Sequence, residues 1–199
     1  RENHASLETE KLLEFLDISY RASRASLQLL DELLDITAIE SGHLELRKIS
    51  FNPDQLLDEI IARNRLFADK KGITIQREGA NAPVEIHADP GKLDQVINNL
   101  LSNAIKYSPQ GSPVTVRTGV QQNAWTVSVI DQGPGIAEAG REKIFKPFGR
   151  AGSRPTGGES STGLGLAIAK RIIDEHRGSI SFETPAGGGT VFTCSVPLG

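Results

Sequence analysis

Polar side chains recur at helical spacing in residues 99–107, where Asn99, Asn103 and Lys106 alternate with apolar residues. Residues three and four apart lie above one another on a helix, so the two carboxamides and the amine are predicted to face the same space. Carboxamide oxygens can coordinate Mg²⁺, and a lysine ammonium can bind an anion. The pattern indicates a site for a metal ion and phosphates. The alternative is an ordinary amphipathic helix with a solvated polar face.

A carboxylate followed by glycines forms a second candidate site, at Asp131-Gln-Gly-Pro-Gly135. Residues 125–130 alternate as a strand, which places Asp131 at a strand end. A carboxylate accepts hydrogen bonds from amino groups, and Gly133 and Gly135 leave the backbone open to close approach by a ligand. The alternative interpretation is a common turn.

Glycines also precede a predicted helix at Gly163-Leu-Gly165, after a loop rich in Gly, Ser and Pro over residues 149–163. Backbone N–H groups at a helix N-terminus bind anions, and glycine removes the side chain that would block them. The spacing matches neither the phosphate-binding P-loop nor the dinucleotide-binding fingerprint. A short Gly-x-Gly motif is also compatible with a plain helix start.

Two aromatic residues, Phe145 and Phe148, stand just before this loop. Aromatic residues three apart most often anchor the base of a loop to the core. Their functional interpretation is a hinge for a lid over a bound nucleotide. The sequence leaves both interpretations open.

A long helix is predicted over residues 9–40, because apolar residues recur there at spacings of three and four. The apolar stripe is too wide for a lone helix in water and requires a partner helix, from the same chain or from a second chain. Ser41 and Gly42 are predicted to end this helix, and an extended linker over residues 43–52 follows.

Mixed α/β structure is predicted from residue 53 onward. Asn52-Pro53 and Asp89-Pro90 each place a capping residue before a proline at the first helical position, so each starts a helix. The second of these helices carries Asn99 and Asn103. The other predicted elements are a helix over 53–69, strands at 73–77, 84–87, 114–118 and 125–130, a helix over 164–176, and a strand pair at 179–183 and 190–196.

Composition narrows the class of protein. The chain has 199 residues, of which 38% are hydrophobic and 24% charged, which is typical of a globular chain rather than a disordered one. Its formal net charge of -3 argues against nucleic acid as the main partner. The single cysteine, Cys194, excludes an internal disulfide and a cysteine-based zinc cluster, and its alternation with polar neighbours predicts a buried strand position.

Targeting signals are not visible in the sequence. No apolar run approaches the roughly 18 residues that a membrane span requires, and the first residues do not resemble a signal peptide. We therefore expect a cytoplasmic fragment without membrane contact of its own, although a longer parent protein could be membrane-anchored.

The order of the motifs is more specific than any one of them. Asn-x-x-x-Asn-Ala-x-Lys-Tyr, Asp-x-Gly-x-Gly, Phe-x-Pro-Phe and Gly-Leu-Gly-Leu follow one another, ending at Leu166, and a final glycine turn stands at Gly187-Gly-Gly-Thr190. This series resembles the N, G1, F and G2 boxes of the ATP-binding domain of sensor histidine kinases, over about residues 50–199. The resemblance implies a Bergerat fold, an α/β sandwich with a mixed sheet that is covered on one face by helices.

The resemblance also implies roles for individual residues, with ATP and Mg²⁺ as cofactors. Asp131 would bind the adenine amino group, Asn103 would coordinate Mg²⁺ with Asn99 beside it, and Lys106 and Tyr107 would approach the phosphates and the base. Asn99, Asn103 and Lys106 are then the candidate catalytic residues. The other implied nucleotide contacts are Gly133, Gly135, Ile136, Phe148, Arg150, Thr162, Gly163, Leu164, Gly165 and Leu166.

The long helix resembles the second helix of the dimerisation and phosphotransfer hairpin of the same kinases. The implied organisation is a partial phosphotransfer region at 1–42, the linker at 43–52 and the catalytic domain at 53–199, with a weak homodimer through residues 9–40. The sequence departs from the family because none of its histidines (His4, His43, His87 and His176) stands in the context of a phosphoacceptor. We expect either that the chain begins just after the acceptor segment or that the parent protein lacks the acceptor.

The implied reaction is transfer of the γ-phosphoryl group of ATP to a protein histidine, for relay to an aspartate of a response-regulator receiver domain. One alternative is a self-contained ATPase related to gyrase B, HSP90 and MutL, but these place a glutamate where this chain has Asn99, and a carboxamide cannot act as a general base. A second alternative is a non-catalytic nucleotide-binding module that controls a partner. The sequence does not identify the input signal or the cognate response regulator.

Overall fold

The computed structural model describes residues 44–79, 84–149 and 162–198, together with Thr156 and separated positions between 11 and 37. The chain divides into two compact units, Arg1–His43 and Leu44–Gly199. Several positions named from the sequence lie outside the described residues: His4, His43, Arg150 and, apart from Thr156 and the two ends, the loop between 149 and 163.

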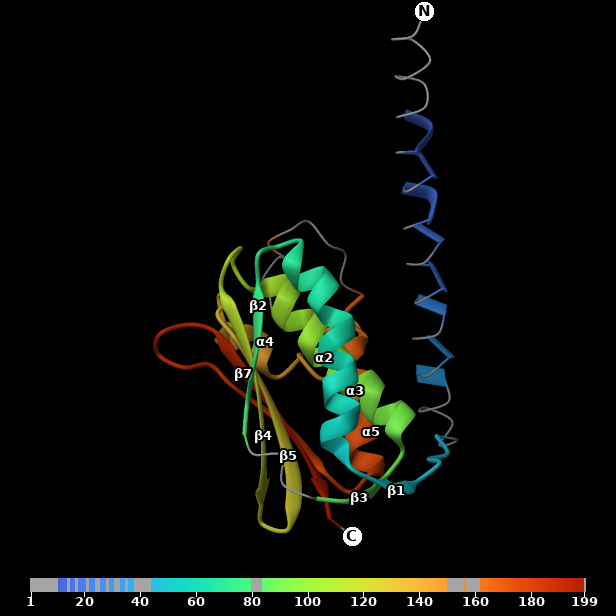
Figure 1. Ribbon diagram of the computed structural model, residues 1–199, viewed down its shortest axis with the longest axis vertical. Coiled ribbons are helices and arrows are strands. Elements are labelled where there is room, and N and C mark those ends of the chain that lie inside the picture. Colours follow the sequence, from blue (N-terminus) through green and yellow to red (C-terminus); the bar gives the residue numbers. More distant parts are fainter. Residues whose placement is uncertain are drawn as a thin grey trace, which may run out of the picture. The chain divides into compact units, whose positions relative to one another are not determined.

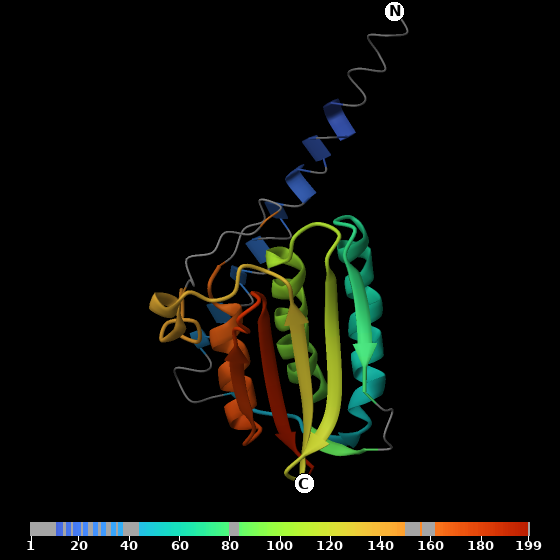
Figure 2. The same ribbon diagram turned by 90° about the vertical axis from the view of Figure 1, so that its left-hand side faces the viewer.

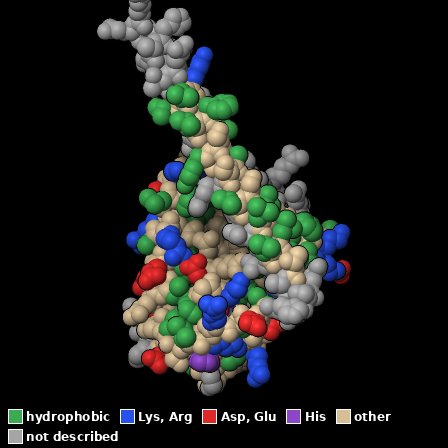
Figure 3. Space-filling model, turned by 90° about the vertical axis from the view of Figure 1, so that its right-hand side faces the viewer, with side chains coloured by type: hydrophobic (Ala, Val, Ile, Leu, Met, Phe, Trp, Pro, Cys, Tyr) green, Lys and Arg blue, Asp and Glu red, His purple; other side chains and the backbone are tan. Residues whose placement is uncertain are grey.

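The described positions of the first unit are helical, in agreement with the helix predicted over residues 9–40. Figure 3 shows hydrophobic side chains on the face of this helix that is turned to the viewer. The large apolar side chains along the helix that are exposed in the single chain are Leu12, Leu13, Phe15, Leu16, Ile18, Leu27, Leu29, Leu30, Leu33 and Leu34. A partner that buries them stays a prediction. Among the described residues, no helix is both long and apolar enough to cross a membrane.

The second unit alternates short strands and helices (Figure 1). In chain order, its elements are β1 (Ile49–Phe51), α2 (Pro53–Asp69), β2 (Thr74–Glu78), β3 (Ile86–Ala88), α3 (Pro90–Tyr107), β4 (Pro113–Gln121), β5 (Ala124–Asp131), α4 (Glu138–Arg141), α5 (Gly165–Glu175), β6 (Ser179–Glu183) and β7 (Thr190–Pro197).

The strands form two sheets. The main sheet has five strands in the order β2-β4-β5-β7-β6, in which β2 pairs with β4 in parallel and the other pairs are antiparallel. The predicted mixed sheet is therefore confirmed. The second sheet joins β1 to β3 in antiparallel register, Ile49 opposite Ala88 and Phe51 opposite Ile86. The segment expected as an extended linker thus contributes a strand.

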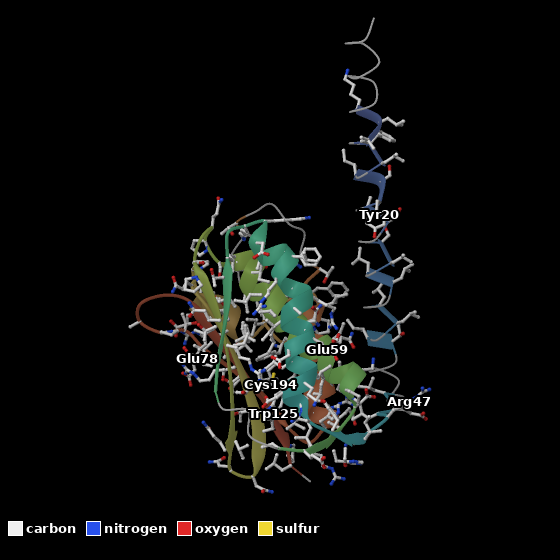
Figure 4. All side chains as sticks on the ribbon, in the orientation of Figure 1. Tyr20, Arg47, Glu59, Glu78, Trp125 and Cys194 are labelled. Carbon is white, nitrogen blue, oxygen red and sulfur yellow. The ribbon has the colours of Figure 1, made fainter. Side chains whose placement is uncertain are left out.

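Helices α2, α3 and α5 lie against one face of the main sheet, as Figure 2 shows. Helix α3 packs between α2 and α5 and buries the face that carries Leu93, Ile97, Leu100 and Leu101. Inward-facing residues of β5 and β7 complete the core, and Figure 4 places Trp125 and Cys194 between the sheet and the helices. The buried strand position predicted for Cys194 is confirmed, and burial raises the pKa of its thiol to about 12.

Local capping explains where the two longest helices of this unit begin. The side chain of Asn52 accepts a hydrogen bond from the Asp54 N–H at 2.9 Å, and that of Asp89 accepts one from the Lys92 N–H at 3.0 Å. A proline follows each cap, where its missing N–H costs no hydrogen bond. Both predicted starts are confirmed.

Candidate functional site

The motifs named from the sequence converge at one end of the second unit. Helices α3 and α5 run antiparallel, because Asn99 in the middle of α3 lies against Gly165 at the start of α5, and Asp89, just before α3, lies against His176, just after α5. The last residue of β5, Asp131, stands opposite Thr190, the first residue of β7. The C-terminal half of α3, the start of α5 and the ends of two central strands therefore surround one region.

Asn99 is held by a specific hydrogen bond. Its side-chain Nδ2 donates to the carbonyl oxygen of Gly165 at 3.0 Å. A Cβ at Gly165 would stand 3.2 Å from the amide carbon and the amide oxygen of Asn99, so the start of α5 lies directly on this amide. The bond fixes the amide nitrogen and leaves Oδ1 as the atom that could meet a cation or a polar ligand.

Asn103, Lys106 and Tyr107 follow on α3, and all three are partly accessible to solvent. The backbone carbonyl of Lys106 accepts a hydrogen bond from Lys71 Nζ at 2.8 Å, and Lys71 Nζ also donates to the Ile105 carbonyl at 2.8 Å. The Lys71 ammonium thus caps the last turn of α3, where the helix dipole favours a positive charge. Sequence reasoning did not identify this lysine.

Asp131 is a buried carboxylate, 7% exposed, whose Oδ1 accepts two backbone hydrogen bonds. The donors are the N–H groups of Gly133, at 2.7 Å, and Thr190, at 3.1 Å. Burial raises the pKa of Asp131 above its ordinary value, and the hydrogen bonds from Gly133 and Thr190 oppose that rise. The arrangement keeps a carboxylate acceptor buried at the end of a strand, with its Oδ1 held by two backbone donors.

The glycines of the site are places of close approach. A Cβ at Gly133 would stand 2.9 Å from the Tyr107 carbonyl oxygen and 3.0 Å from Asp131 Oδ1. Gly163 has a φ of +75° and lies against the backbone of Phe148 and Gly149, with a Cβ clearance of 3.0 Å. Side chains at these positions would collide with the protein's own backbone, so glycine is what lets α3, the strand ends and the segment before α5 approach one another this closely. The chemistry of the residues present, a buried carboxylate, two carboxamides and a helix N-terminus, fits a nucleotide and its metal ion.

The remaining positions differ in what they can offer. Ile136 is buried, and the side chain of Leu164 is 1% exposed and belongs to the core, so a ligand could meet only the Leu164 backbone. Thr162 Oγ1 accepts from the Leu164 N–H at 3.2 Å and so orders the approach to α5. The side chain of Leu166 stays partly accessible, and Gly135 adopts a φ of +73°.

The two aromatic residues before the loop have separate environments. Phe145 packs on Phe182 of β6 with ring centroids 6.0 Å apart, which confirms the anchoring interpretation for this residue. Phe148 is 66% exposed and has a φ of +59°, a backbone conformation that is strained for an aromatic residue. Phe145 therefore anchors the base of the loop, whereas a role as a hinge stays a prediction for Phe148.

Three contacts at the site had no local signal in the sequence. Thr190 is 5% exposed and hydrogen-bonds to Asp131 through its N–H and its side chain. Gly189 has a φ of +82°, and a Cβ there would stand 2.3 Å from the Asp131 carbonyl oxygen. Thr156 Oγ1 donates to the carbonyls of Lys106 and Ser108 at 3.0 Å and 2.8 Å, which joins this residue to the end of α3. The glycine turn at 187–190 was the only available pointer to the first two.

Comparison with known proteins supplies independent evidence. A family model described as histidine kinase-, DNA gyrase B- and HSP90-like ATPase matches residues 88–199. The sensor-like histidine kinase SenX3 of Mycolicibacterium smegmatis is 34% identical over 172 residues, which are 85% of this chain and 44% of SenX3. This chain spans between 12% and 44% of the length of eight curated relatives that it matches.

Solved structures of histidine kinases have the same fold. Full-length ShkA in complex with AMPPNP superposes with a TM-score of 0.75 at 27% identity, over 86% of this chain and 35% of ShkA. The nucleotide-free catalytic domain of ThkA gives a TM-score of 0.66 at 31% identity, over 76% of this chain and 96% of that domain. ThkA in complex with the response regulator protein TrrA gives 0.69 at 29% identity, over 87% of this chain and 49% of ThkA.

Proposed function

Because this chain belongs to the histidine kinase-, DNA gyrase B- and HSP90-like ATPase family, as a histidine kinase catalytic domain with the Bergerat fold, we propose that it transfers the γ-phosphoryl group of ATP to a protein histidine. The observation that carries this proposal is the amide of Asn99, held by Gly165 at the start of α5. A carboxamide cannot take a proton from water, so the site favours transfer to a protein acceptor over hydrolysis.

Asp131 is the residue that we assign to the adenine amino group. Its Oδ1 already accepts from Gly133 and Thr190, so these donors fix the carboxyl plane and Oδ2 is the acceptor offered to the base. A buried charged acceptor discriminates well, because an analogue without the amino group leaves the carboxylate unpaired. The backbone of Gly163 and Gly165 would then meet the phosphates at the start of α5.

Asn103 and Asn99 are the residues that we assign to Mg²⁺, and Lys106 to the phosphates. Two carboxamide oxygens one helical turn apart suit a hard cation that keeps part of its water shell and binds phosphate oxygens. When bound, Mg²⁺ would neutralise charge on the transferred group. Tyr107, Ile136, Phe148, Arg150, Thr162, Leu164 and Leu166 complete the proposed nucleotide contacts, Leu164 through its backbone.

The acceptor histidine is proposed to be none of the four histidines of this sequence. Of its four histidines, His176 is 4% exposed and its ring is hydrogen-bonded on both sides. His87 is exposed on β3, at the end of the unit that carries His176 rather than Asn99. His4 and His43 lack the sequence context of an acceptor.

The proposed partners follow from the same function. The exposed apolar side chains of the first unit support a weak homodimer through residues 9–40, with a second copy of the helix as the occupant. The complex of ThkA with a response regulator supports a receiver domain as the final phosphoryl acceptor. We place this part of the protein in the cytoplasm.

Labelled ATP tests the proposal. With ATP and Mg²⁺, the chain alone should bind nucleotide but form no acid-labile phosphohistidine, whereas an added helical fragment with an acceptor histidine should receive the label. Asn103→Ala should abolish transfer, and Gln110→Ala, at an exposed amide just beyond α3, should leave it intact. Hydrolysis without transfer would indicate an ATPase, and binding without either reaction a non-catalytic module. Labelling of the unaided chain on one of its histidines would show that the acceptor is misassigned.

A further inference from the structure

The segment that leads into the second unit is fastened to it away from the candidate site. Strand β1 pairs with β3, and just before it the backbone N–H of Arg47 donates to Asp89 Oδ2 at 2.8 Å. The Arg47 side chain is exposed at the margin of the unit (Figure 4), so the contact is made by its backbone. Residues 47–51 are thus held at two places, by the β1–β3 ladder and by a hydrogen bond from the Arg47 N–H to the Asp89 carboxylate.

Asp89 connects three parts of the unit through one residue. The Asp89 Oδ2 accepts a hydrogen bond from the Arg47 N–H. The Asp89 Oδ1 accepts one from the Lys92 N–H at 3.0 Å and so caps α3. The Asp89 N–H donates to His176 Nε2 at 3.0 Å. His176 follows the last residue of α5. The start of α3, the end of α5 and the incoming segment therefore meet at Asp89.

These hydrogen bonds define the state of the His176 ring. Nδ1 lies 2.8 Å from the Ile172 carbonyl oxygen, which can only accept, and Nε2 faces the Asp89 N–H, which can only donate. Only the neutral tautomer with hydrogen on Nδ1 satisfies both partners. A second N–H on the ring would point at the N–H of Asp89.

We propose that Asp89 and His176 are positioning residues that hold residues 47–51 on the ATP-binding unit, and that this hold requires neutral His176. Helix α3 begins at this contact and carries Asn99 in its middle, and α5 ends at this contact and begins at Gly165, so the entry point of the chain is fixed relative to the nucleotide site. A fixed entry point limits the positions that an acceptor helix can take relative to ATP. This consequence for catalysis rests on the proposed function.

The surroundings of His176 decide how the hold responds to pH. Burial lowers the pKa of His176, and Lys48, whose ammonium faces the end of α5, lowers it further. The hydrogen bond to the Ile172 carbonyl opposes that lowering of the pKa most strongly, and the charges of Asp89, before α3, and of Glu175, in α5, oppose it further. When His176 gains a proton on Nε2, the Asp89 N–H loses its hydrogen-bond acceptor. We expect the backbone of Asp89 to shift in response, which moves its carboxylate away from the Arg47 N–H.

Amide exchange of Arg47, measured by NMR on the whole chain between pH 8 and pH 5, tests the proposal. After correction for the intrinsic rate, protection should fall by roughly three- to tenfold, as expected for one lost hydrogen bond. The midpoint should coincide with the imidazole titration of His176. Protection that stays constant or rises as His176 gains its proton would overturn the proposal, and this measurement needs no variant.

Two substitutions sharpen the test. His176→Gln keeps an acceptor for the Asp89 N–H but cannot titrate, so Arg47 should stay protected at every pH. His87→Gln tests the other imidazole beside this segment, which lies 3.5 Å from the Ser50 hydroxyl of β1. If His176 controls the hold, the pH dependence of Arg47 should persist in His87→Gln, and its loss there would assign the hold to His87. If the dependence survives in His176→Gln, another group controls the hold and the proposal fails.

ATP affinity separates this inference from the proposed function. Calorimetry should give His176→Gln the affinity of the unmodified chain within about twofold, because the contact lies at the start of α3 and the end of α5, away from Asn99 and Gly165. If His176→Gln lowers both ATP affinity and the protection of Arg47, His176 stabilises the whole unit rather than positioning residues 47–51, and the positioning role is overturned. Absence of ATP binding in the unmodified chain would defeat the proposed function and leave the Arg47 result standing.

Discussion

The side chain of Asn99 donates its amide hydrogen to the carbonyl oxygen of Gly165 across 3.0 Å, which ties the middle of α3 to the first residue of α5. One amide thus has two tasks. Its nitrogen holds the glycine-rich start of α5, and its oxygen stays available for a cation or a phosphate-bound water. The contact joins two motifs that stand 66 residues apart in the chain.

We predict that Gly165→Ala weakens ATP binding without unfolding the protein. The new Cβ would stand 3.2 to 3.3 Å from the carbon, oxygen and nitrogen of the Asn99 amide and would displace either the amide or the start of α5. Alanine favours the helix over glycine by about 1 kcal/mol, so the melting temperature should not fall. Titration calorimetry with a non-hydrolysable ATP analogue should show an affinity loss of roughly fivefold, or about 1 kcal/mol.

Gly187→Ala is the matched control for that change. No heavy atom lies within 4 Å of a Cβ built at Gly187, and its φ is not positive, so this substitution adds the same methyl group without a contact. Its ATP affinity should equal that of the unmodified chain. Equal affinities for Gly165→Ala and Gly187→Ala would show that the Asn99 amide does not need its present position.

We predict that Asp131→Asn lowers ATP affinity by about tenfold or more, because a hydrogen bond to a charged buried acceptor contributes about 1.5–3 kcal/mol. The variant keeps an oxygen for the Gly133 and Thr190 donors but offers an amino group to adenine. Asp69→Asn, at an exposed position at the end of α2, is the control and should bind normally. Calorimetry that finds the two variants alike would remove Asp131 from the adenine site.

The same carboxyl group gives a prediction for stability against pH. Burial raises the folded pKa of Asp131 above 3.8, so the folded state holds its proton to higher pH than the unfolded state does. The contribution of this group to the free energy of unfolding therefore decreases as pH rises from 3.8 through the folded pKa. Denaturant titrations should show that Asp131→Asn removes this decrease and does not lower stability at pH 7. A less stable variant at pH 7 would indicate that the charge stabilises the fold.

Much of the site could be predicted from sequence because its signals are local. The caps at Asn52 and Asp89, the spacing of Asn99 and Asn103, and the aspartate at the end of β5 each depend on a few neighbouring residues. The alternation around Cys194 likewise follows from the two faces of one strand. These features survive folding because tertiary contacts reinforce them.

The rest depends on residues far apart in the chain. Strands β1 and β3 have three residues each, and their pairing joins segments 37 residues apart. The contact of Lys71 with the end of α3 and that of Asp89 with His176 likewise cannot be predicted from the spacing of apolar residues. Strand β4 extends past Gly119 to Gln121, although a glycine and a polar tail read as the end of a strand.

We predict that Cys194 reports global unfolding. Its thiol is 1% exposed on β7, between β5 and β6, and its pKa of about 12 leaves almost no thiolate at neutral pH. A thiol reagent such as Ellman's reagent should label the native protein only as fast as the sheet opens, and labelling should follow the unfolding transition in urea. Rapid stoichiometric labelling of the native protein would show that this part of the sheet opens locally.

The last prediction concerns self-association. The second unit buries its own core, whereas Leu30, Leu33 and the other apolar side chains of the first unit are exposed in the single chain. Burial of such surface contributes about 25 cal/mol per Å², so the intact chain should dimerise weakly, and residues 44–199 should be monomeric and still bind ATP. Leu30→Lys should weaken the dimer in analytical ultracentrifugation, while Ser23→Lys adds the same charge at a polar helical position and should have less effect. An intact chain that stays monomeric at high concentration, or two lysine variants with equal effects, would show that the apolar stripe is not the dimer interface.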